Sequence, residues 1–527
     1  MGAVDSPGMG NGGGKWISRL SAGKYRRMDA QAEEGNVLER ESAGRSHSRK
    51  YVLACAIFAS FNSVLLGYDV GVMSGAIIFI QKDLHITEVQ QEILVGSLSF
   101  VSIIGSMIGG RTSDAIGRKW TIGLAAIVFQ AGAAIMTFAP NYLLLMTGRL
   151  LAGIGIGLGV MIAPVYIAEI SPTISRGSFT SFPEICINVG ILLGYVSNYA
   201  FSDLSEHMSW RIMLGLGILP SIFVGCALFG IPESPRWLVM QKRIDEAKSV
   251  LLLISANASE AEERLADIEE AAGTSNTEKH EGKGVWTELL HPSPALRWMM
   301  ITGFGIQCFQ QISGIDASVY YSPTIFKDAG IQSDSEVLAA TVAVGFTKTI
   351  FILVAIFLID RVGRKPLLYV STIGMTVCLS GLALSLALLA DESVPPKFGI
   401  MAAIFAVCGN VAFFSVGIGP ICWVLSSEIF PLKLRAQACA IGAAGNRICS
   451  GLIAMSFLSL TKAISVAGTF SIFAAVAALS VLFVHFAVPE TKGKSLEQIE
   501  NMFQGGRVWQ GSEVELGDVE HLVLREN

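Results

Sequence analysis

The sequence has few charged residues for its length. Aspartate, glutamate, lysine and arginine make up 15% of its 527 residues, whereas about a quarter of an average globular protein is charged. Hydrophobic residues make up 52%. Because so much apolar surface needs lipid around it, the composition excludes a soluble enzyme. The net charge of −5 is small and gives no reason to expect a nucleic-acid partner.

Sequence patterns for metal binding and catalysis are also missing. The nine cysteines lie in apolar stretches without a CxxC pair, which indicates small buried side chains rather than a disulfide framework or a metal site. No pair of the seven histidines has metal-ligand spacing. HExxH, GxSxG and Walker patterns are absent. We therefore expect no enzyme, no catalytic residue, no metal and no cofactor.

The charges that are present gather in three segments. Residues 1–50, 232–297 and 489–527 hold 47 of the 81 charged side chains. The two blocks between them contain apolar runs of the length that crosses a bilayer, ~20 residues. These runs predict twelve transmembrane helices, six in each block. Their approximate spans are 52–80, 92–111, 120–139, 142–167, 180–201, 211–231, 297–325, 337–359, 366–389, 398–426, 436–460 and 465–488.

The pattern predicts an all-α membrane protein with two six-helix bundles and a cytoplasmic helical linker. The regions are an N-terminal tail (1–50), a first bundle (51–231), a helical loop (232–296), a second bundle (297–488) and a C-terminal tail (489–527). Nine lysines and arginines of the short loops fall on one face and five on the other. The positive-inside bias places the richer face, the long loop and both tails in the cytoplasm.

The two halves repeat each other. DAIGRK at 114–119 returns as DRVGRK at 360–365, an offset of 246, and EISP at 169–172 returns as EIFP at 428–431, an offset of 259. Pro232-Glu233 returns as Pro489-Glu490. Three motifs in the same order indicate a duplicated six-helix unit. Such repeats are typical of secondary transporters, whose halves rock around a site near the bilayer midplane.

Several motifs resemble those of the sugar porter branch of the major facilitator superfamily. They are GGRTSDAIGRK (109–119), RLLAGIGIGLGVMIAPVYIAEISPTISRG (149–177), PESPRWL (232–238), QQISGIDASVYYSP (310–323), DRVGRK (360–365), GPICW (419–423) and PETKG (489–493). GYDVGVMSGA (67–76) and SFPE (181–184) are similar to stretches of plant polyol/monosaccharide–proton symporters. The resemblance implies the major facilitator fold and proton-coupled import of linear polyols, such as sorbitol, mannitol and xylitol, and of monosaccharides by alternating access.

Six ionisable residues lie deep in the predicted helices, where each costs ~2.5–3.5 kcal/mol on insertion scales. Two of them, Asp69 and Arg149, match the proton-binding aspartate of the resembled family and its arginine partner. Ionised Asp69 can pair with Arg149, and protonation would release the arginine and bias the conformation. A purely structural pair is the alternative.

The resemblance also implies a substrate site. The positions that match sugar contacts are Gln310, Gln311, Tyr320, Trp423 and Asn446. Amides suit hydroxyl groups and an indole covers a carbon face, although polar residues that join helices are the alternative. The other four deep charges depart from the hexose-carrier pattern and agree with the polyol subgroup. They are Glu184, Asp316, Lys348 and Arg447. We expect pairing among these two acids and two bases, with carboxylates that accept hydrogen bonds from a polyol.

Charges at the cytoplasmic helix ends resemble the gating network of the family. The set consists of Asp114, Arg118, Glu169, Arg176, Glu233 and Arg236 in the first half, and of Asp360, Arg364, Glu428, Arg435 and Glu490 in the second. Such charges can lock the bundles in an outward-open state. Each surface pair is worth only ~0–1 kcal/mol, so a network is needed. Helix caps and topology signals are the alternative.

We expect a multi-pass protein of the plasma membrane that works as a monomer, with a polyol or sugar, protons and the lipid bilayer as its partners. A facilitative sugar or polyol uniporter and a transporter-like sugar sensor are the competing functions. Related uniporters carry a neutral residue at the position of Asp69, so this aspartate favours symport.

Overall fold

The described part of the chain is helical and contains no strand. The computed structural model describes residues 13–171, 179, 182–255, 257–278, 288–289, 291–390, 395–431, 434–492, 494, 499 and 502–503. Side chains are described from residue 48 onward, except at 271–278, 360, 396, 427, 435 and 436.

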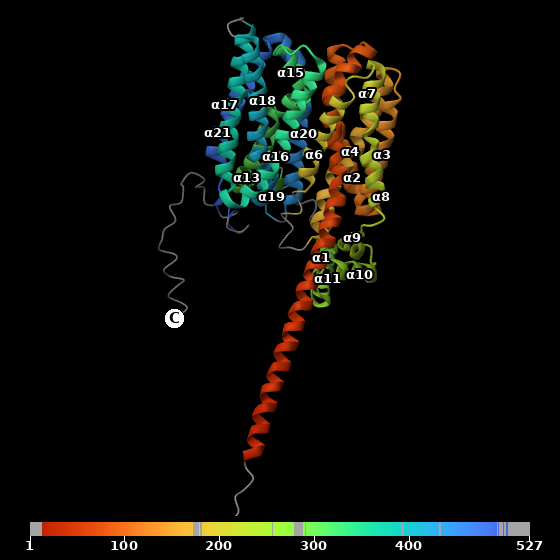
Figure 1. Ribbon diagram of the computed structural model, residues 1–527, viewed down its shortest axis with the longest axis vertical. Coiled ribbons are helices and arrows are strands. Elements are labelled where there is room, and N and C mark those ends of the chain that lie inside the picture. Colours follow the sequence, from red (N-terminus) through yellow and green to blue (C-terminus); the bar gives the residue numbers. More distant parts are fainter. Residues whose placement is uncertain are drawn as a thin grey trace, which may run out of the picture.

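The helices form two groups that stand side by side (Figure 1). The first half consists of α1 (Gly13–Leu84), α2 (Glu88–Ile116), α3 (Arg118–Thr137), α4 (Tyr142–Ile170), α6 (Phe182–Ala200), α7 (Glu206–Gly215) and α8 (Ile218–Ala227). The second half consists of α13 (Pro294–Ile312), α14 (Ile315–Tyr320), α15 (Ser322–Asp328), α16 (Asp334–Val362), α17 (Arg364–Ala390), α18 (Pro396–Val416), α19 (Ile418–Ile429), α20 (Arg435–Ile464) and α21 (Val466–Ala487).

Three helices that connect the halves in the sequence mark one end of the molecule, which we call the loop end. They are α9 (Pro235–Met240), α10 (Ile244–Ile254) and α11 (Ala258–Glu278). The Ser48 hydroxyl of α1 donates to the carbonyl of Ile254 (2.5 Å), which ties α10 to the start of the apolar part of α1. We call the opposite end, where α1 ends and α2 begins, the far end (Figure 1).

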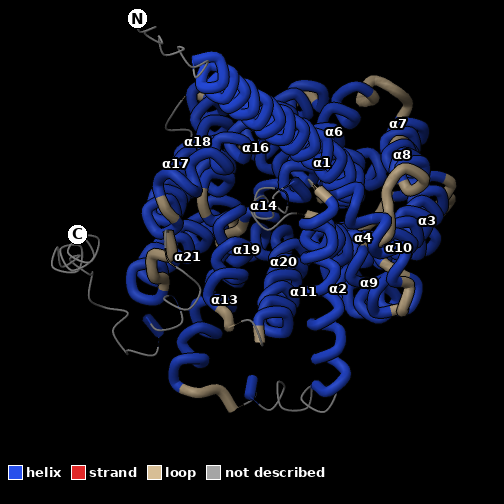
Figure 2. Tube along the Cα trace, turned by 90° about the horizontal axis from the view of Figure 1, so that it is seen from below, coloured by secondary structure: helices blue, strands red, loops and turns tan. Residues whose placement is uncertain are grey.

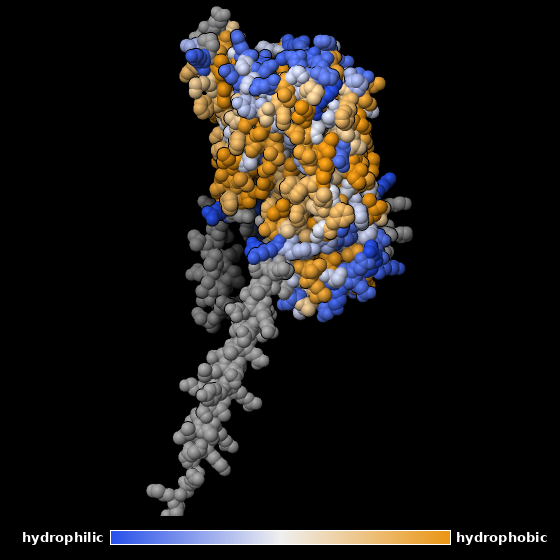
Figure 3. All heavy atoms as spheres, turned by 45° about the vertical axis from the view of Figure 1, so that its right-hand side comes forward, coloured by the Kyte–Doolittle hydropathy of each residue, from blue (hydrophilic) through white to orange (hydrophobic). Residues whose placement is uncertain are grey.

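Ten helices of the described chain are long and apolar enough to cross a membrane. In this count α7 joins α8 as one span, and α18 joins α19. Helix α6 and the series α13–α15, which carry more polar residues, complete six segments in each half. The prediction of twelve transmembrane helices in two bundles is confirmed. Figure 3 shows the corresponding belt of hydrophobic side chains between two hydrophilic ends.

The predicted helix at 297–325 is broken into α13, α14 and α15 at Gly314. This glycine has a φ of +82°, a left-handed conformation that side chains with a Cβ rarely adopt. A Cβ here would lie 2.5 Å from the ring of Phe473. The break places the short helix α14 in the middle of the molecule, as Figure 2 shows from the loop end.

Helices α1 and α6 pack with their backbones in close contact. A Cβ on Gly67 would lie 1.9 Å from the carbonyl oxygen of Ile187, and a Cβ on Gly190 would lie 2.5 Å from that of Val64. Only glycine allows this approach, which is common between membrane helices. The contact fixes the part of α1 that carries Asp69.

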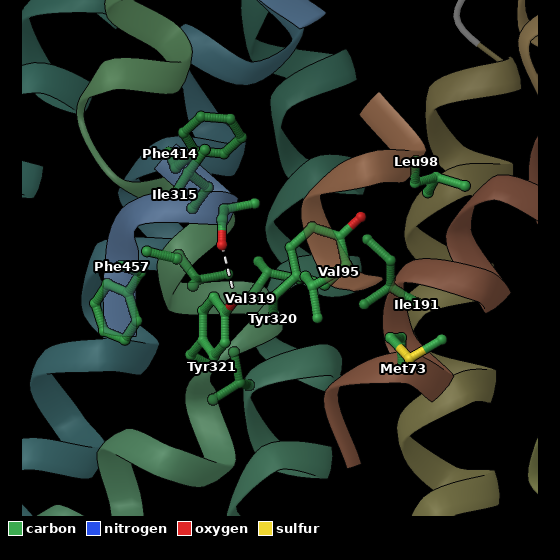
Figure 4. Packing of buried hydrophobic residues seen from close by; sticks show 14 of the residues in the cluster. Met73, Val95, Leu98, Ile191, Ile315, Val319, Tyr320, Tyr321, Phe414 and Phe457 are labelled. Atoms are coloured by element: carbon green, nitrogen blue, oxygen red, sulfur yellow. Dashed lines mark hydrogen bonds between the residues drawn. The ribbon is translucent and has the colours of Figure 1, made fainter. Parts of the chain in front are cut away.

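The two halves meet mainly through α2 with α20, α6 with α16, and α1 with α14 and α15. Buried residues of both halves form one hydrophobic cluster. Figure 4 shows part of it, with Val95 of α2 beside Tyr320 of α14. The interface is therefore a packed core around α14.

Candidate functional site

Asp69 of α1 and Arg149 of α4 form an ion pair inside the first half. Arg149 Nη1 donates to Asp69 Oδ2, and neither side chain is more than 2% exposed. Arg149 Nε donates to the carbonyl of Leu94 (3.1 Å). Its Nη2 has no hydrogen-bond partner among the described residues. Since Arg149 is completely buried, its charge depends on Asp69 for compensation.

The predicted amide residues come together at the junction of α13, α19 and α20. Gln311 Nε2 donates to Asn446 Oδ1 (3.1 Å), and Asn446 Nδ2 donates to Gln310 Oε1 (2.6 Å). Gln310 Nε2 donates to the carbonyl of Gly419 (2.9 Å). The buried oxygen Gln311 Oε1 accepts no hydrogen bond from any described residue. The cluster thus joins helices and also keeps an acceptor for a hydroxyl group.

The two predicted aromatic residues have different surroundings. Tyr320 is buried and lies next to Val95 (Figure 4). Tyr320 lies on α14, which contacts both α1 and α20, and the charges of Arg149, Asp69 and Asp316 act on its hydroxyl group. Trp423 of α19 is 37% exposed, which leaves its indole accessible.

The four remaining deep charges do not form direct ion pairs with one another. Glu184 of α6 is half-buried, and the charges of Lys348 of α16 and Arg447 of α20 act on it. Lys348 is 8% exposed, interacts electrostatically with Glu184 and Asp316, and lies 5.4 Å from the ring centroid of Phe414. The sequence predicts pairing; the structure shows opposite charges on different helices that interact electrostatically without a direct ion pair.

Asp316 is connected to the first half by a chain of hydroxyl groups. The Ser450 hydroxyl of α20 donates to Asp316 Oδ2. Ser450 Oγ also lies 2.9 Å from Ser99 Oγ of α2. Because Ser450 gives its only hydroxyl proton to Asp316, it accepts a hydrogen bond from Ser99. Hydrogen bonds through Ser450 therefore link the carboxylate of Asp316, at the candidate substrate site, to α2 of the first half.

The predicted charges at the loop end of the first half surround the start of α3. Arg118 binds both oxygens of Glu169 (3.0 and 3.2 Å) and also Asp114 (3.1 Å). Glu233 Oε1 accepts from the backbone N–H groups of Arg118 (2.9 Å) and Lys119 (3.1 Å). Burial raises the pKa of the Glu233 carboxyl, although these backbone N–H groups act in the opposite direction.

The second half repeats this arrangement at the start of α17. Arg364 Nη2 binds Glu428 Oε1 (2.9 Å). Glu490 accepts from the backbone N–H groups of Arg364 (3.1 Å) and Lys365 (2.9 Å). Gly363 has a φ of +110°, as Gly117 has +99° before α3. The repeated sequence motifs thus fold into two equivalent helix-capping clusters.

These clusters join helices within one half, and the described residues show no ion pair between them. Arg236 is exposed. Arg176 lies outside the described residues, as do the side chains of Asp360 and Arg435. The predicted lock between the bundles is therefore not visible in the described contacts at this end.

Polar contacts between described residues of the two halves lie instead at the far end and near mid-depth, and the sequence did not predict them. Lys82 binds Asp334 (2.9 Å), and Lys462 binds Glu88 (2.7 Å). Glu92, also of α2, binds Ser459 of α20. Acidic residues at the starts of α2 and α16 were the available signal. Their partners depend on which helices meet, which the sequence does not show.

The chain matches a family model, that of the sugar (and other) transporters, over residues 55–503. It is 66% identical to the probable polyol transporter 4 of Arabidopsis thaliana, over 99% of this chain and 98% of that protein. It is 51% identical to polyol transporter 5 of the same plant, over 88% of each chain.

A solved structure is also similar. It is that of the proton:xylose symporter XylE of E. coli bound to 6-bromo-6-deoxy-D-glucose, with 28% sequence identity and a TM-score of 0.71. The match covers 86% of this chain and all of the other.

Proposed function

We propose that this chain, which belongs to the sugar (and other) transporter family, is a symporter that imports linear polyols and monosaccharides with protons. Family membership makes it a membrane transporter and not an enzyme. The names of two relatives support a polyol as the substrate, and the similarity to the solved proton:xylose symporter supports coupling to protons. The single observation that carries the proposal is the buried pair of Asp69 and Arg149.

The pair provides a proton-dependent switch. When Asp69 is ionised, it holds Arg149 and so ties α1 to α4. A proton on Asp69 would remove that charge and leave the arginine to find new partners, which favours another arrangement of the helices. The charges of both residues, and those of Asp316 and Arg447 in the second half, act on the hydroxyl group of Tyr320. Proton occupancy and substrate binding can therefore influence each other through α14.

The candidate substrate site combines the amide cluster with the separated charges. Gln310, Gln311 and Asn446 offer donors and acceptors for hydroxyl groups, and Trp423 offers an apolar ring face. The remaining contacts come from Tyr320, Glu184, Asp316, Lys348 and Arg447. Carboxylates are strong acceptors for hydroxyl donors, and an open-chain polyol can bend to meet several of them. Opposite charges that interact without a direct ion pair keep acceptors and donors for a hydroxyl-rich substrate.

The orientation follows from the distribution of basic residues. The loop end would face the cytoplasm with both termini, and the far end would face the exterior at the plasma membrane. The contacts at the far end then correspond to a state that is closed to the outside. The capping clusters, built around Arg118 and Arg364, would rearrange when the inner side closes. The bundles over 51–231 and 297–488 would move as units, and a single chain would suffice.

Sorbitol-induced current in a transport-deficient cell tests the proposal. We expect an inward current that grows as the outer solution is acidified and is lost in Asp69→Asn. Asp83→Asn is the matched control, because Asp83 lies on the same helix and binds Arg211 (2.9 Å) without contact to Arg149. The control should retain the current.

Other outcomes would refute symport. Polyol uptake that survives Asp69→Asn and ignores an uncoupler would identify a facilitator. No uptake of any polyol or sugar, with normal protein at the cell surface, would favour a sensor.

A further inference from the structure

Helices α2 and α20 form a seam between the halves that runs from the far end to mid-depth. Its first contact is the exposed ion pair of Glu88 and Lys462. One turn deeper, Glu92 meets Ser459. A Cβ on Gly96 would lie 2.2 Å from the Met455 side chain, so the helices touch there. The seam ends at the hydrogen bond between Ser99 and Ser450, beside the candidate substrate site.

Among these side chains, Glu92 is buried and uses both of its carboxylate oxygens in hydrogen bonds across the seam. It is 3% exposed, and both of its oxygens accept hydrogen bonds from the opposite half. Ser459 N donates to Oε1 (2.7 Å) and Ser459 Oγ donates to Oε2 (2.6 Å). A buried carboxylate needs such donors, because burying it without them is costly. Separation of α2 from α20 would remove both hydrogen bonds at once.

The internal repeat shows that packing alone does not require a carboxylate here. The offset of 246 residues relates α2 to α16. It relates Glu88 to Asp334, and both form ion pairs across the interface. The same offset relates Glu92 to Leu338, which is completely buried. The outer ion pair is thus duplicated, whereas the carboxylate one turn deeper occurs in the first half alone.

We propose that Glu92 is a positioning residue that holds the far end closed, and that the seam of α2 and α20 is the outer gate. This inference rests on the proposed function, since it takes the far end to face the exterior and the halves to alternate. Glu92 does not touch the substrate. It sets how often the seam opens, and opening the seam exposes the carboxylate of Asp316 to solvent from outside.

The test is outside labelling of a cysteine within the seam. Val95 is 2% exposed and lies on α2 between Glu92 and Ser99, so Val95→Cys reports opening. A membrane-impermeant maleimide is applied to intact cells without substrate, and the parent chain without the reporter gives the background of the native cysteines. We expect Glu92→Ala to raise the labelling rate about tenfold. Glu92→Gln, which keeps the shape and an acceptor, should give an intermediate rate.

Glu88→Ala is the matched control, because it removes an exposed acidic contact between the same two helices. It should change the labelling rate less than about twofold. Glu92→Ala should also lower the maximal rate of uptake while its half-saturating concentration changes little. Equal labelling of the Glu92 and Glu88 variants would overturn the proposal, and so would a rise in half-saturation alone.

The design separates this inference from the proposed function. Labelling needs no substrate. If no polyol current were seen but Glu92→Ala were labelled faster, the proposed substrate would be refuted and the role of Glu92 in the outer gate would stand. Labelling from the cytoplasmic side in inside-out vesicles, and none from outside, would refute the orientation and with it the outer gate. If Glu92→Ala were misfolded, as judged by gel filtration, Glu92→Gln alone would decide by the same comparison with Glu88→Ala.

Discussion

Replacing Asp69 by asparagine leaves Arg149 as a buried cation without a counter-charge. Arg149 is 0% exposed, and its remaining hydrogen bond is the one to the Leu94 carbonyl. Removing one partner of a buried ion pair costs about 3–5 kcal/mol, whereas replacing both by apolar groups is often neutral. We therefore expect Asp69→Asn to be markedly less stable than Asp69→Asn combined with Arg149→Met. The coupling between the two sites should be about 3 kcal/mol.

Thermal unfolding in detergent, followed by tryptophan fluorescence, measures this order. Arg149→Met should be milder than Asp69→Asn, because a carboxyl group can take up a proton while an arginine cannot lose one. The double variant should regain most of the lost Tm without regaining transport. If the two substitutions were additive, Arg149 would not depend on Asp69 for its charge. Asp69 and Arg149 would then not act as a proton-controlled switch.

Two further predictions concern other carboxylates. Glu184→Gln and Asp316→Asn should each raise the half-saturating sorbitol concentration about tenfold through the loss of a charge-assisted hydrogen bond; unchanged polyol uptake in both would contradict their role at the site. Burial raises the pKa of the Glu233 carboxyl, so the folded state binds a proton at this carboxyl more readily than the unfolded state. The contribution of the Glu233 carboxyl to stability therefore falls as the pH rises above about 4.5. The Tm of the parent relative to Glu233→Gln should therefore increase as the pH is lowered from about 7 to about 5, and a constant difference would refute this.

The number of membrane-crossing helices could be read from the sequence because lipid demands long apolar runs. The breaks within them could not. The predicted helix at 297–325 is interrupted at Gly314, which has a left-handed φ and leaves no room for a Cβ beside the ring of Phe473, far along the chain. Helix α1 likewise begins at Gly13, well before its apolar part. Hydropathy reports how much of a segment needs lipid, not where its backbone turns or how far it extends into water.

The candidate site shows the same division. Resemblance selected Asp69 and Arg149, and the structure brings them into contact. The resemblance also selected Glu184 and Lys348, which the sequence predicts to form ion pairs; in the structure they interact electrostatically without a direct ion pair. The contact of Glu92 with Ser459 was missed entirely. The resemblance identified partners within one half, whereas partners across the interface depend on how the two halves meet.

The duplication offers a way to separate the frame of this protein from its proposed function. Where the repeats agree, as at Gly117 and Gly363, the residues hold helix ends in both halves by the same geometry. Where they diverge, a charge appears on one side only. Lys348 is related by the 246-residue offset to Ser102, and Glu92 to a leucine. Both repeats run in the same direction between the loop end and the far end, so equal halves would line the space between them symmetrically. The proposed proton pair, which lies in the first half alone, requires differences between the halves. The single charges at the interface are the places where the two repeats have acquired such differences.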